Sequence, residues 1–404
     1  MSTDPRLLLD HASRLEGPEL AAYRAAGGRV VGYSCVSTPR ELLDAAGLLP
    51  YRIRALGSAA RELADARMSR FNCSFCRSCL QLGLDGSYDF LDGLIETNGC
   101  DHLRGMFENW QHAREVGSLP RSAGRARGSD TAREQDTVRE GWFFHYLPVP
   151  HLINEDTLAV FVEDLGLMRQ ALEQHYEVRL SDDALRAAMD RQATIRARMR
   201  QVQQLRERPE PALSGSEALA LTLLESAWPL DRFEELLDDL LHGWSHCRPT
   251  RIHPPRARLL LAGSATDELA LVQAMEQMGG LIVADGLCYG TRVFWTEETP
   301  PIDEDPLTTL ARSYLHHLLC PRMFDDYARR LAFITDAVGR AAVEGVVLVH
   351  NKFCDLHGVE NVRLRIDLEQ RGIPVLVLEK EYGAASDLGR IATRLQAFLE
   401  RLGR

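Results

Sequence analysis

Residues 345–378, GVVLVHNKFCDLHGVENVRLRIDLEQRGIPVLVL, contain the pattern that decides the fold. A short apolar run at Val346–His350 is followed by a helical stretch at Val359–Gln370 and a second apolar run at Val375–Leu378. Short apolar strands without alternation, separated by helices, are typical of a parallel sheet covered on both faces. The stretch therefore predicts a strand–helix–strand unit of an α/β protein, with Cys354 shortly after its first strand.

The same alternation continues on both sides of this unit, beginning after the proline pair at 254–255. Strands are predicted at Arg258–Ala262 and Leu281–Ala284, and helices at Thr266–Met278, Arg322–Val338 and Asp387–Leu402. This pattern predicts a doubly wound C-terminal domain over residues 251–404.

The N-terminal half, residues 1–250, is predicted to be a more decorated α/β domain. Its strands are expected at Arg29–Gly32, Pro50–Ile53, Gly93–Glu96 and Trp142–Val149. Helices capped by Asn154 and Ser181, and a helical stretch at Ser214–Trp244, add to this domain. Residues 117–141 are rich in Gly, Ser, Arg and Thr, which predicts an exposed loop.

Length and composition set the broad class of the protein. The 404 residues, 45% hydrophobic and 26% charged, are typical of a globular protein with more than one domain. No apolar run approaches the roughly 18–20 residues that cross a membrane, and charges are mixed through the N-terminal MSTDPRLLLDHASRLEG. We therefore expect a cytoplasmic protein without a membrane partner. The net charge of −11, with arginines scattered between acids, gives no indication of a nucleic-acid partner.

The nine cysteines are the main candidates for function. In a reducing cytoplasm they are expected to serve core packing, metal binding or redox chemistry rather than disulfides. Cys35, Cys100, Cys288 and Cys354 each follow a predicted strand within a few residues. Because the carboxyl ends of parallel strands form the crevice where ligands bind, these thiols are expected near such a crevice.

The spacing of the cysteines favours a distributed iron–sulfur site. Cys73, Cys100 and Cys354 would hold a four-iron cluster from distant loops. A compact set of Cys73, Cys76 and Cys79 is similar to part of a ferredoxin ligand run, but no fourth cysteine and proline follow at the expected place. If Cys79 lies on a helix it faces near Cys76, and both then serve packing.

Two further interpretations of the cysteines stay open. A zinc site would combine paired cysteines with His102 or His357, although the spacing fits no usual zinc module. Alternatively, most of the cysteines are buried, unreactive thiols of the core.

A series of short motifs runs through most of the chain apart from residues 117–141. They are Gly32-Tyr33-Ser34-Cys35, Pro39-Arg40-Glu41-Leu42, Ala45-Ala46-Gly47, Cys73-Ser74-Phe75, Arg77-Ser78, Tyr88-Asp89-Phe90-Leu91-Asp92-Gly93, Cys100-Asp101, Asp285-Gly286, Arg292, Cys320-Pro321, Lys352-Phe353-Cys354-Asp355 and Gly389-Arg390. In these motifs and in their order, the chain resembles the subunits of benzoyl-CoA reductase and 2-hydroxyacyl-CoA dehydratase.

The resemblance implies two flavodoxin-like domains with a four-iron (4Fe-4S) cluster in the cleft between them, held by Cys73, Cys100 and Cys354. It implies an oxygen-sensitive CoA-thioester enzyme that acts as a heterodimer with a homologous second subunit or as a homodimer. Electrons would come from a separate ATP-hydrolysing iron–sulfur activator. The chain fits this division of labour, since it contains neither GxxxxGK[ST] nor a GxGxxG fingerprint.

Several reactions are compatible with the resemblance. The local sequence around Cys76 and Cys100 is similar to that of the benzoyl-CoA reductase branch, which implies ring reduction. The alternatives are dehydration of a 2-hydroxyacyl-CoA through a ketyl radical, a double-cubane reductase, and an electron-relay or scaffold subunit without a substrate site. A double cubane would need a second ligand set, for which Cys35, Cys288 and Cys320 are the candidates.

Other candidate site residues are polar. Ser34, Ser37 and His102 are candidates for proton transfer or substrate positioning, although Ser37 also suits a turn and His102 the first turn of a helix. The Gly263-Ser264 turn, ahead of a predicted helix, is a candidate for binding a CoA phosphate, and Arg292 for contacting an anion.

Overall fold

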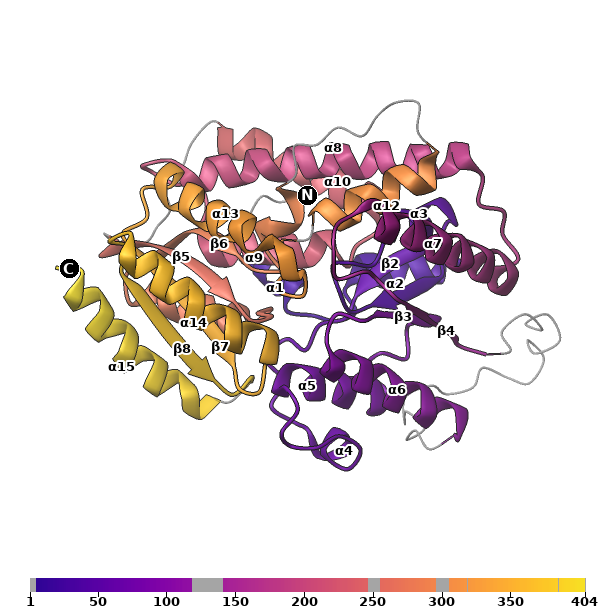
Figure 1. Cartoon of the computed structure of the whole chain (residues 1–404), viewed down its shortest axis with the longest axis horizontal. Coiled ribbons are helices and arrows are strands. Elements are labelled where there is room, and N and C mark those ends of the chain that lie inside the picture. Colours follow the sequence, from indigo (N-terminus) through magenta and orange to yellow (C-terminus); the bar gives the residue numbers. More distant parts are fainter. Residues whose placement is uncertain are drawn as a thin grey trace.

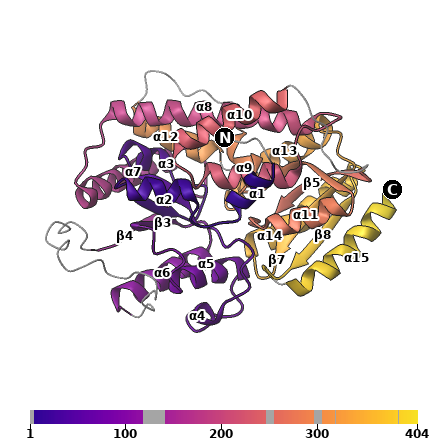
Figure 2. The same ribbon diagram turned by 180° about the vertical axis from the view of Figure 1, so that it is seen from behind.

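The computed structural model describes residues 5–117, 141–245, 255–295, 305–317, 319–383 and 385–403. Within these residues the chain forms two four-stranded sheets, and every strand pair is parallel (Figure 1). Helices lie around both sheets, as the view from behind also shows (Figure 2). The predicted α/β class with two parallel sheets is confirmed.

The first sheet has the strand order β2-β1-β3-β4. Its strands are β1 (Val30–Tyr33), β2 (Leu49–Arg52), β3 (Gly93–Thr97) and β4 (Phe143–Leu147). All residues of β1, β2 and β3 are buried, including the charged-type residues Arg52 of β2 and Glu96 of β3. Each predicted strand of this sheet is present, with bounds that differ by two residues or fewer.

The second sheet repeats this order as β6-β5-β7-β8. Its strands are β5 (Ala257–Gly263), β6 (Gly280–Gly286), β7 (Gly345–Asn351) and β8 (Val375–Lys380). In each sheet the first and third strands in the chain lie side by side at the centre. The carboxyl ends of β1 and β3, and of β5 and β7, are therefore neighbours.

Helices make up most of the remaining described residues. In chain order they are α1 (Pro5–Ala12), α2 (Pro18–Ala25), α3 (Arg40–Ala45), α4 (Glu62–Asp65), α5 (Ser74–Leu84), α6 (Asp101–Glu115), α7 (Glu155–Tyr176), α8 (Asp182–Glu207), α9 (Gly215–Glu225), α10 (Leu230–Ser245), α11 (Leu269–Gln277), the 3₁₀ helices η2 (Thr291–Phe294) and η3 (Phe324–Asp326), α12 (Pro306–His317), α13 (Tyr327–Arg340), α14 (Asp355–Gln370) and α15 (Ala385–Arg401). None of the described helices is both long and apolar enough to cross a membrane.

Some helices differ from the prediction. The helical stretch at Ser214–Trp244 is two helices, α9 and α10, because Pro229 interrupts the hydrogen-bonding pattern between them. Helix α12 was not predicted, since it lies in a polar part of the chain whose packing against α7 supplies its stability. Helix α14 begins at Asp355, four residues before its predicted start, which makes Cys354 its N-cap residue.

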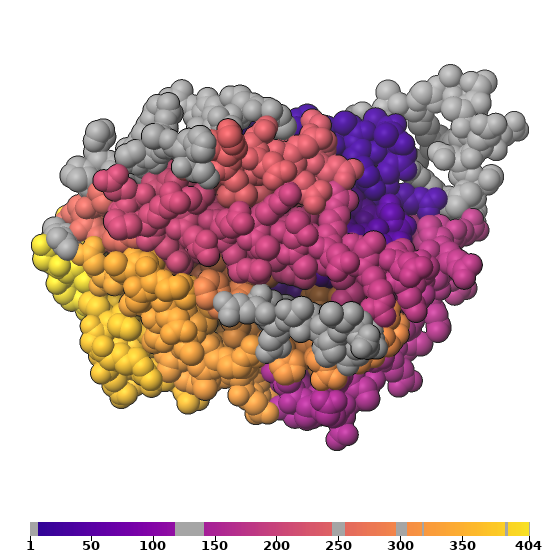
Figure 3. All heavy atoms as spheres, turned by 90° about the horizontal axis from the view of Figure 1, so that it is seen from above, coloured from indigo at the N-terminus to yellow at the C-terminus, as the bar shows by residue number. Residues whose placement is uncertain are grey.

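The long helix α8 connects the two halves of the molecule. It packs against α3 near the first sheet and against β6 and η2 of the second. Figure 3 shows it as a magenta ridge between the indigo and the orange parts of the surface. The predicted division at residue 250 lies outside the described residues, as does the loop predicted at 117–141 except for its end residues, so both stay predictions.

Direct hydrogen bonds also join the two halves close to the strand ends. The Arg52 guanidinium donates to the Cys288 carbonyl, and the Tyr289 hydroxyl donates to the Ile53 carbonyl. The Tyr382 backbone N–H donates to the Ser74 hydroxyl at 2.9 Å. These contacts hold the carboxyl ends of the two sheets next to each other.

Candidate metal centre

Four thiols from the two halves of the chain meet in one place. The sulfur atom of Cys73 lies within hydrogen-bonding reach of those of Cys354 and Cys76, and Cys76 in turn reaches Cys100. The structure thus brings together Cys73, Cys100 and Cys354, the three cysteines expected from the sequence, and adds Cys76.

Helix starts position these thiols. Cys100 follows β3 and is the N-cap residue of α6, where its sulfur accepts a hydrogen bond from the Leu103 N–H at 3.4 Å. Cys354 follows β7 at the same position of α14, and Cys73 is the N-cap residue of α5. Since backbone N–H groups and the helix dipole favour negative charge at a helix start, these positions stabilise thiolates.

The thiols share protons. A hydrogen bond from the Cys354 thiol, with the Cys76 thiol also within reach, holds the pKa of Cys73 well below its usual value, and interaction with the Cys76 thiol lowers the pKa of Cys100. The same contacts raise the pKa values of Cys76 and Cys354, which act as the donors. The pKa values of two of the four thiols are thus shifted toward the thiolate, the form that binds metal.

The donor set is made of sulfur, which suits an iron–sulfur cluster and, as four thiolates, also zinc. In the described residues no group of three or more His, Cys, Asp or Glu side chains is arranged around a single metal ion. The nearest imidazole, that of His102, is already engaged, because its Nδ1 accepts the Cys73 N–H at 3.2 Å. Its Nε2 lies 3.6 Å from an Asp355 carboxylate oxygen. Sulfur alone is the ligand type expected of a cluster.

The structure separates Cys76 from Cys79, both of which were predicted to serve packing. Cys76 lies one helical turn after Cys73 and touches two of the other thiols. Cys79 is buried in the hydrophobic core, and this burial raises the pKa of its thiol. The three-residue spacing between Cys73 and Cys76 was the sequence feature that could have indicated a role for Cys76. The position of Cys100 shows which side of α5 faces the other thiols.

Cys35, Cys288 and Cys320 form the secondary set of cysteines, and Cys35 lies beside Gly99, the residue before Cys100. Cys35 accepts a hydrogen bond from the Ser37 hydroxyl at 3.1 Å. Burial raises the pKa of Cys320, whose nearest charged neighbours include Arg292 and Cys35. The carbonyl of Cys288 binds Arg52. The structure describes all three, and their role as a second ligand set stays a prediction.

Ser34 and Ser37 are joined to the end of β3. The Ser34 hydroxyl donates to a Glu96 carboxylate oxygen at 2.6 Å, and the hydroxyls of Ser37 and Thr97 are 3.0 Å apart. Both serines are buried. Glu96 was not singled out in the sequence, since a glutamate at the end of a strand ordinarily faces solvent.

The turn after β5 supports Cys354. Gly263 has φ +116°, and a Cβ atom there would overlap the Val349 carbonyl, so the position requires glycine. The Ser264 N–H donates to the Val349 carbonyl at 2.9 Å, while its hydroxyl accepts the Asn351 N–H at 3.0 Å and lies within reach of the Cys354 thiol. The predicted binding of a CoA phosphate by Gly263 and Ser264 stays a prediction.

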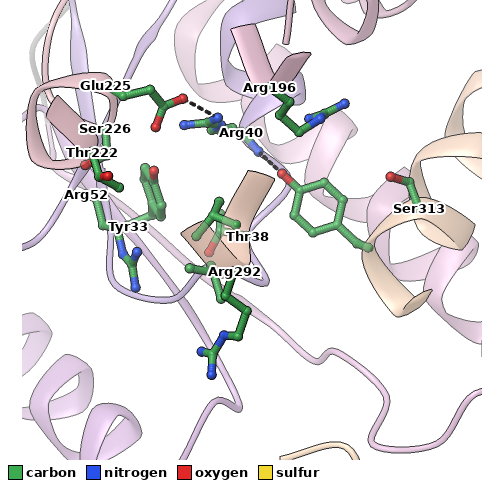
Figure 4. A pocket seen from close by; sticks show the side chains of 13 residues that line it. Tyr33, Thr38, Arg40, Arg52, Arg196, Thr222, Glu225, Ser226, Arg292 and Ser313 are labelled. Carbon is green, nitrogen blue, oxygen red and sulfur yellow. Dashed lines mark hydrogen bonds and ion pairs between the residues drawn. The ribbon is translucent and has the colours of Figure 1, made fainter. Parts of the chain in front are cut away.

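A cavity lies between the first sheet, α8, α9 and η2 (Figure 4). Its volume is about 50 Å³, and Tyr33 and Thr38 form part of its wall. Among the arginines that line it, Arg40 pairs with Glu225, and Arg196 with Glu41 at 3.0 Å.

Arg292 differs from the other arginines of this cavity. Its side chain is 6% exposed, and its Nε has no hydrogen-bond partner in the described part of the chain. In Figure 4 its guanidinium and that of Arg52 point to the same side, away from the Arg40–Glu225 ion pair. A buried cation of this kind is a ready binding partner for an anion.

Fold and site together define an α/β protein whose two parallel sheets place four cysteine sulfurs in contact. A family model described as 2-hydroxyglutaryl-CoA dehydratase, D-component, matches residues 35–402. The chain therefore belongs to this family, and the resemblance seen in its motifs is confirmed.

Characterised relatives cover nearly the whole chain at low identity. A benzoyl-CoA reductase subunit of Thauera aromatica is 24% identical over 86% of this chain and 84% of that protein. The (R)-phenyllactyl-CoA dehydratase beta subunit of Clostridium sporogenes is 23% identical over 100% of both chains. The beta subunit of (R)-2-hydroxyglutaryl-CoA dehydratase from Acidaminococcus fermentans is 22% identical over 95% of each. Identities this similar do not separate a reductase from a dehydratase.

Proposed function

We propose that this chain is the iron–sulfur subunit of an oxygen-sensitive CoA-thioester enzyme of the cytoplasm. The observation that carries the proposal is the meeting of Cys73, Cys100 and Cys354, with Cys76 beside them, at the ends of two parallel sheets. These three cysteines would hold a 4Fe-4S cluster, which supplies single low-potential electrons when bound. Cys76 is the proton-sharing neighbour of two of these ligands.

The reaction we propose is reduction of an aromatic acyl-CoA of the benzoyl-CoA type. Dehydration of a 2-hydroxyacyl-CoA is the second candidate, since the relatives named above include enzymes of both kinds. A cavity beside Tyr33 supports a substrate site in this subunit over a pure electron relay. Within that site, Arg292 is the proposed contact for an anionic oxygen of the acyl-CoA.

The proposed partners follow from this role. The relatives are subunits of larger enzymes by name, so a homologous second subunit is the expected partner, with a homodimer as the alternative. Electrons would be supplied by a separate ATP-hydrolysing iron–sulfur activator.

Anaerobic purification followed by iron and sulfide analysis and EPR of the reduced protein tests the cluster. We expect about four irons per chain, the content of one cubane. The Cys354→Ala variant should lose this iron, whereas Cys79→Ala, a matched change of another buried cysteine, should keep it. Absence of iron from wild-type protein never exposed to air would refute the proposal, and about eight irons would favour the double-cubane alternative.

The role of Arg292 has its own test. Arg292→Gln should raise KM for the acyl-CoA by about tenfold, the loss expected for one charge-assisted hydrogen bond, with unchanged iron content. Unchanged KM would remove Arg292 from the substrate site without affecting the cluster assignment.

A further inference from the structure

Glu96 is a carboxyl group in the interior, one residue before the end of β3. Its side chain is 0% exposed. One carboxyl oxygen, Oε1, accepts the Ser34 hydroxyl at 2.6 Å and the Thr97 backbone N–H at 2.8 Å. The other oxygen, Oε2, is buried and has no hydrogen-bond partner in the residues that the structure describes. Among the described residues, one carboxyl oxygen thus has two hydrogen-bond donors and the other has none.

Among the described residues, the titratable neighbours of Glu96 provide no counter-ion. They are Cys79 on α5, Cys100 at the start of α6 and Tyr146 on β4, each of which is either neutral or negative. A buried carboxylate without a cation is strongly disfavoured, so the group retains its proton. Burial, the largest cause, raises the pKa of Glu96 to about 8. Because Oε1 is occupied by two donors, the acidic proton resides on Oε2.

The carboxyl group lies within the proposed site. Cys100 follows Glu96 on the same strand end, and Ser34 joins it to the start of the loop after β1. Tyr33, just before this loop, and Thr38, within it, line the cavity. Glu96 is thus joined through Ser34 to the loop that forms part of the cavity wall, and it lies four residues before Cys100 in the chain.

We propose that Glu96 is the proton donor of this site and protonates the acyl group once that group has been reduced, an inference that rests on the proposed function. The O–H bond at Oε2 breaks, and the proton forms a bond to the electron-rich acyl group. The electrons come from the iron–sulfur donor named above. The resulting carboxylate is stabilised by the Ser34 hydroxyl and the Thr97 N–H, and it regains a proton from solvent before the next turnover.

Infrared difference spectroscopy of the anaerobically purified chain tests whether Glu96 holds the proton. At pH 7 we expect a C=O stretching band of a neutral carboxylic acid that disappears with a midpoint near pH 8 and is absent in Glu96→Gln. Glu276→Gln is the matched control, because Glu276 is a second buried carboxyl with a raised pKa, bound to the start of α9. Loss of a different band, or of none, in Glu96→Gln would overturn the inference.

Measurements of kcat distinguish a proton donor from a residue with a purely structural role. Glu96→Gln should lower kcat by about 10²-fold or more, the usual contribution of a general acid, with unchanged iron content and EPR signal. Glu96→Asp should retain part of the activity and shift its pH profile, and Glu276→Gln should retain all of it. Full activity of Glu96→Gln, or loss of its iron, would overturn the donor role. If the wild-type chain contains no iron, the proposed function fails, whereas the infrared band still decides whether Glu96 is protonated.

Discussion

The carboxyl ends of the two sheets are built alike and carry different chemistry. In both sheets the residue that caps the helix after the third strand is a cysteine, Cys100 after β3 and Cys354 after β7. In both, a serine after the first strand bonds to the end of the third: the Ser34 hydroxyl donates to the Glu96 carboxyl group, and the Ser264 hydroxyl accepts the Asn351 backbone N–H. The serine of the first sheet thus contacts a titratable side chain, and that of the second contacts the backbone.

The difference indicates a division of roles between the two halves. At the end of β7, Ser264 and Asn351 are neutral, and they hold the loop in place through hydrogen bonds at 3.0 Å and 2.7 Å. At the end of β3, Ser34 contacts a side chain that can release a proton. A repeated fold therefore supplies matching thiols, while the contacts of the two serines differ.

The largest expected effect tests whether the two capping cysteines, Cys100 and Cys354, have equivalent roles. If both are ligands, Cys100→Ala and Cys354→Ala should each reduce iron content to background, because a cluster held by three thiolates does not survive the loss of one. Cys320→Ala, a change of a buried cysteine outside the group of four, should keep its iron. Iron analysis and EPR measure all three, and iron loss in only one of the first two would disprove the equivalence.

Asn351→Asp would place a carboxyl group at the end of β7, beside Ser264. The Asn351 Nδ2 donates to the Ala265 carbonyl at 2.7 Å, so an ionised carboxylate would place an acceptor against this carbonyl oxygen in place of a donor. We expect a loss of stability on the order of 3 kcal/mol at pH 8 and a smaller loss at pH 5, where the new carboxyl is protonated. Denaturant unfolding at both pH values measures it, and an equal loss at both would contradict this reason.

Glu96→Gln should change how stability depends on pH. The native pKa of about 8 exceeds the ordinary value of 4.5, so between these values the native state binds a proton that the unfolded state has released. Wild-type stability therefore decreases as pH rises through this window, and Glu96→Gln lacks this decrease. The variant should gain stability relative to wild type from about pH 5 to pH 8, on the order of a few kcal/mol. A constant difference across the window would mean that Glu96 is ionised.

The smallest effects concern the two serines. Ser34→Ala and Ser264→Ala each remove one buried hydrogen bond, and each should cost about 1 kcal/mol in unfolding experiments. Only Ser34→Ala should also raise the pKa of Glu96, because it removes a donor to the carboxylate. The midpoint of the infrared band measures this shift, and a similar shift in Ser264→Ala would contradict the assignment.

Much of the fold could be predicted from the sequence, because strands and helices follow local periodicity. Val346–His350 was expected as a strand and β7 spans it, and the strand expected at Gly93–Glu96 is β3. The prediction missed α12 and the break between α9 and α10, where stability comes from packing between distant segments. The placement of Cys100 and Cys354 just after strands was sufficient to indicate a shared site.

The sequence by itself determined the two parallel sheets, the family and three of the four thiols that meet, since strand ends and helix caps are local features. Only the tertiary structure decided that Cys76 contacts two of the other thiols, because that depends on which side of α5 meets α6. The same is true of Glu96. Neighbouring strands and helices bury it without a cation from the described residues beside it, and burial of that kind is a property of the packed molecule rather than of the residues around it in the chain.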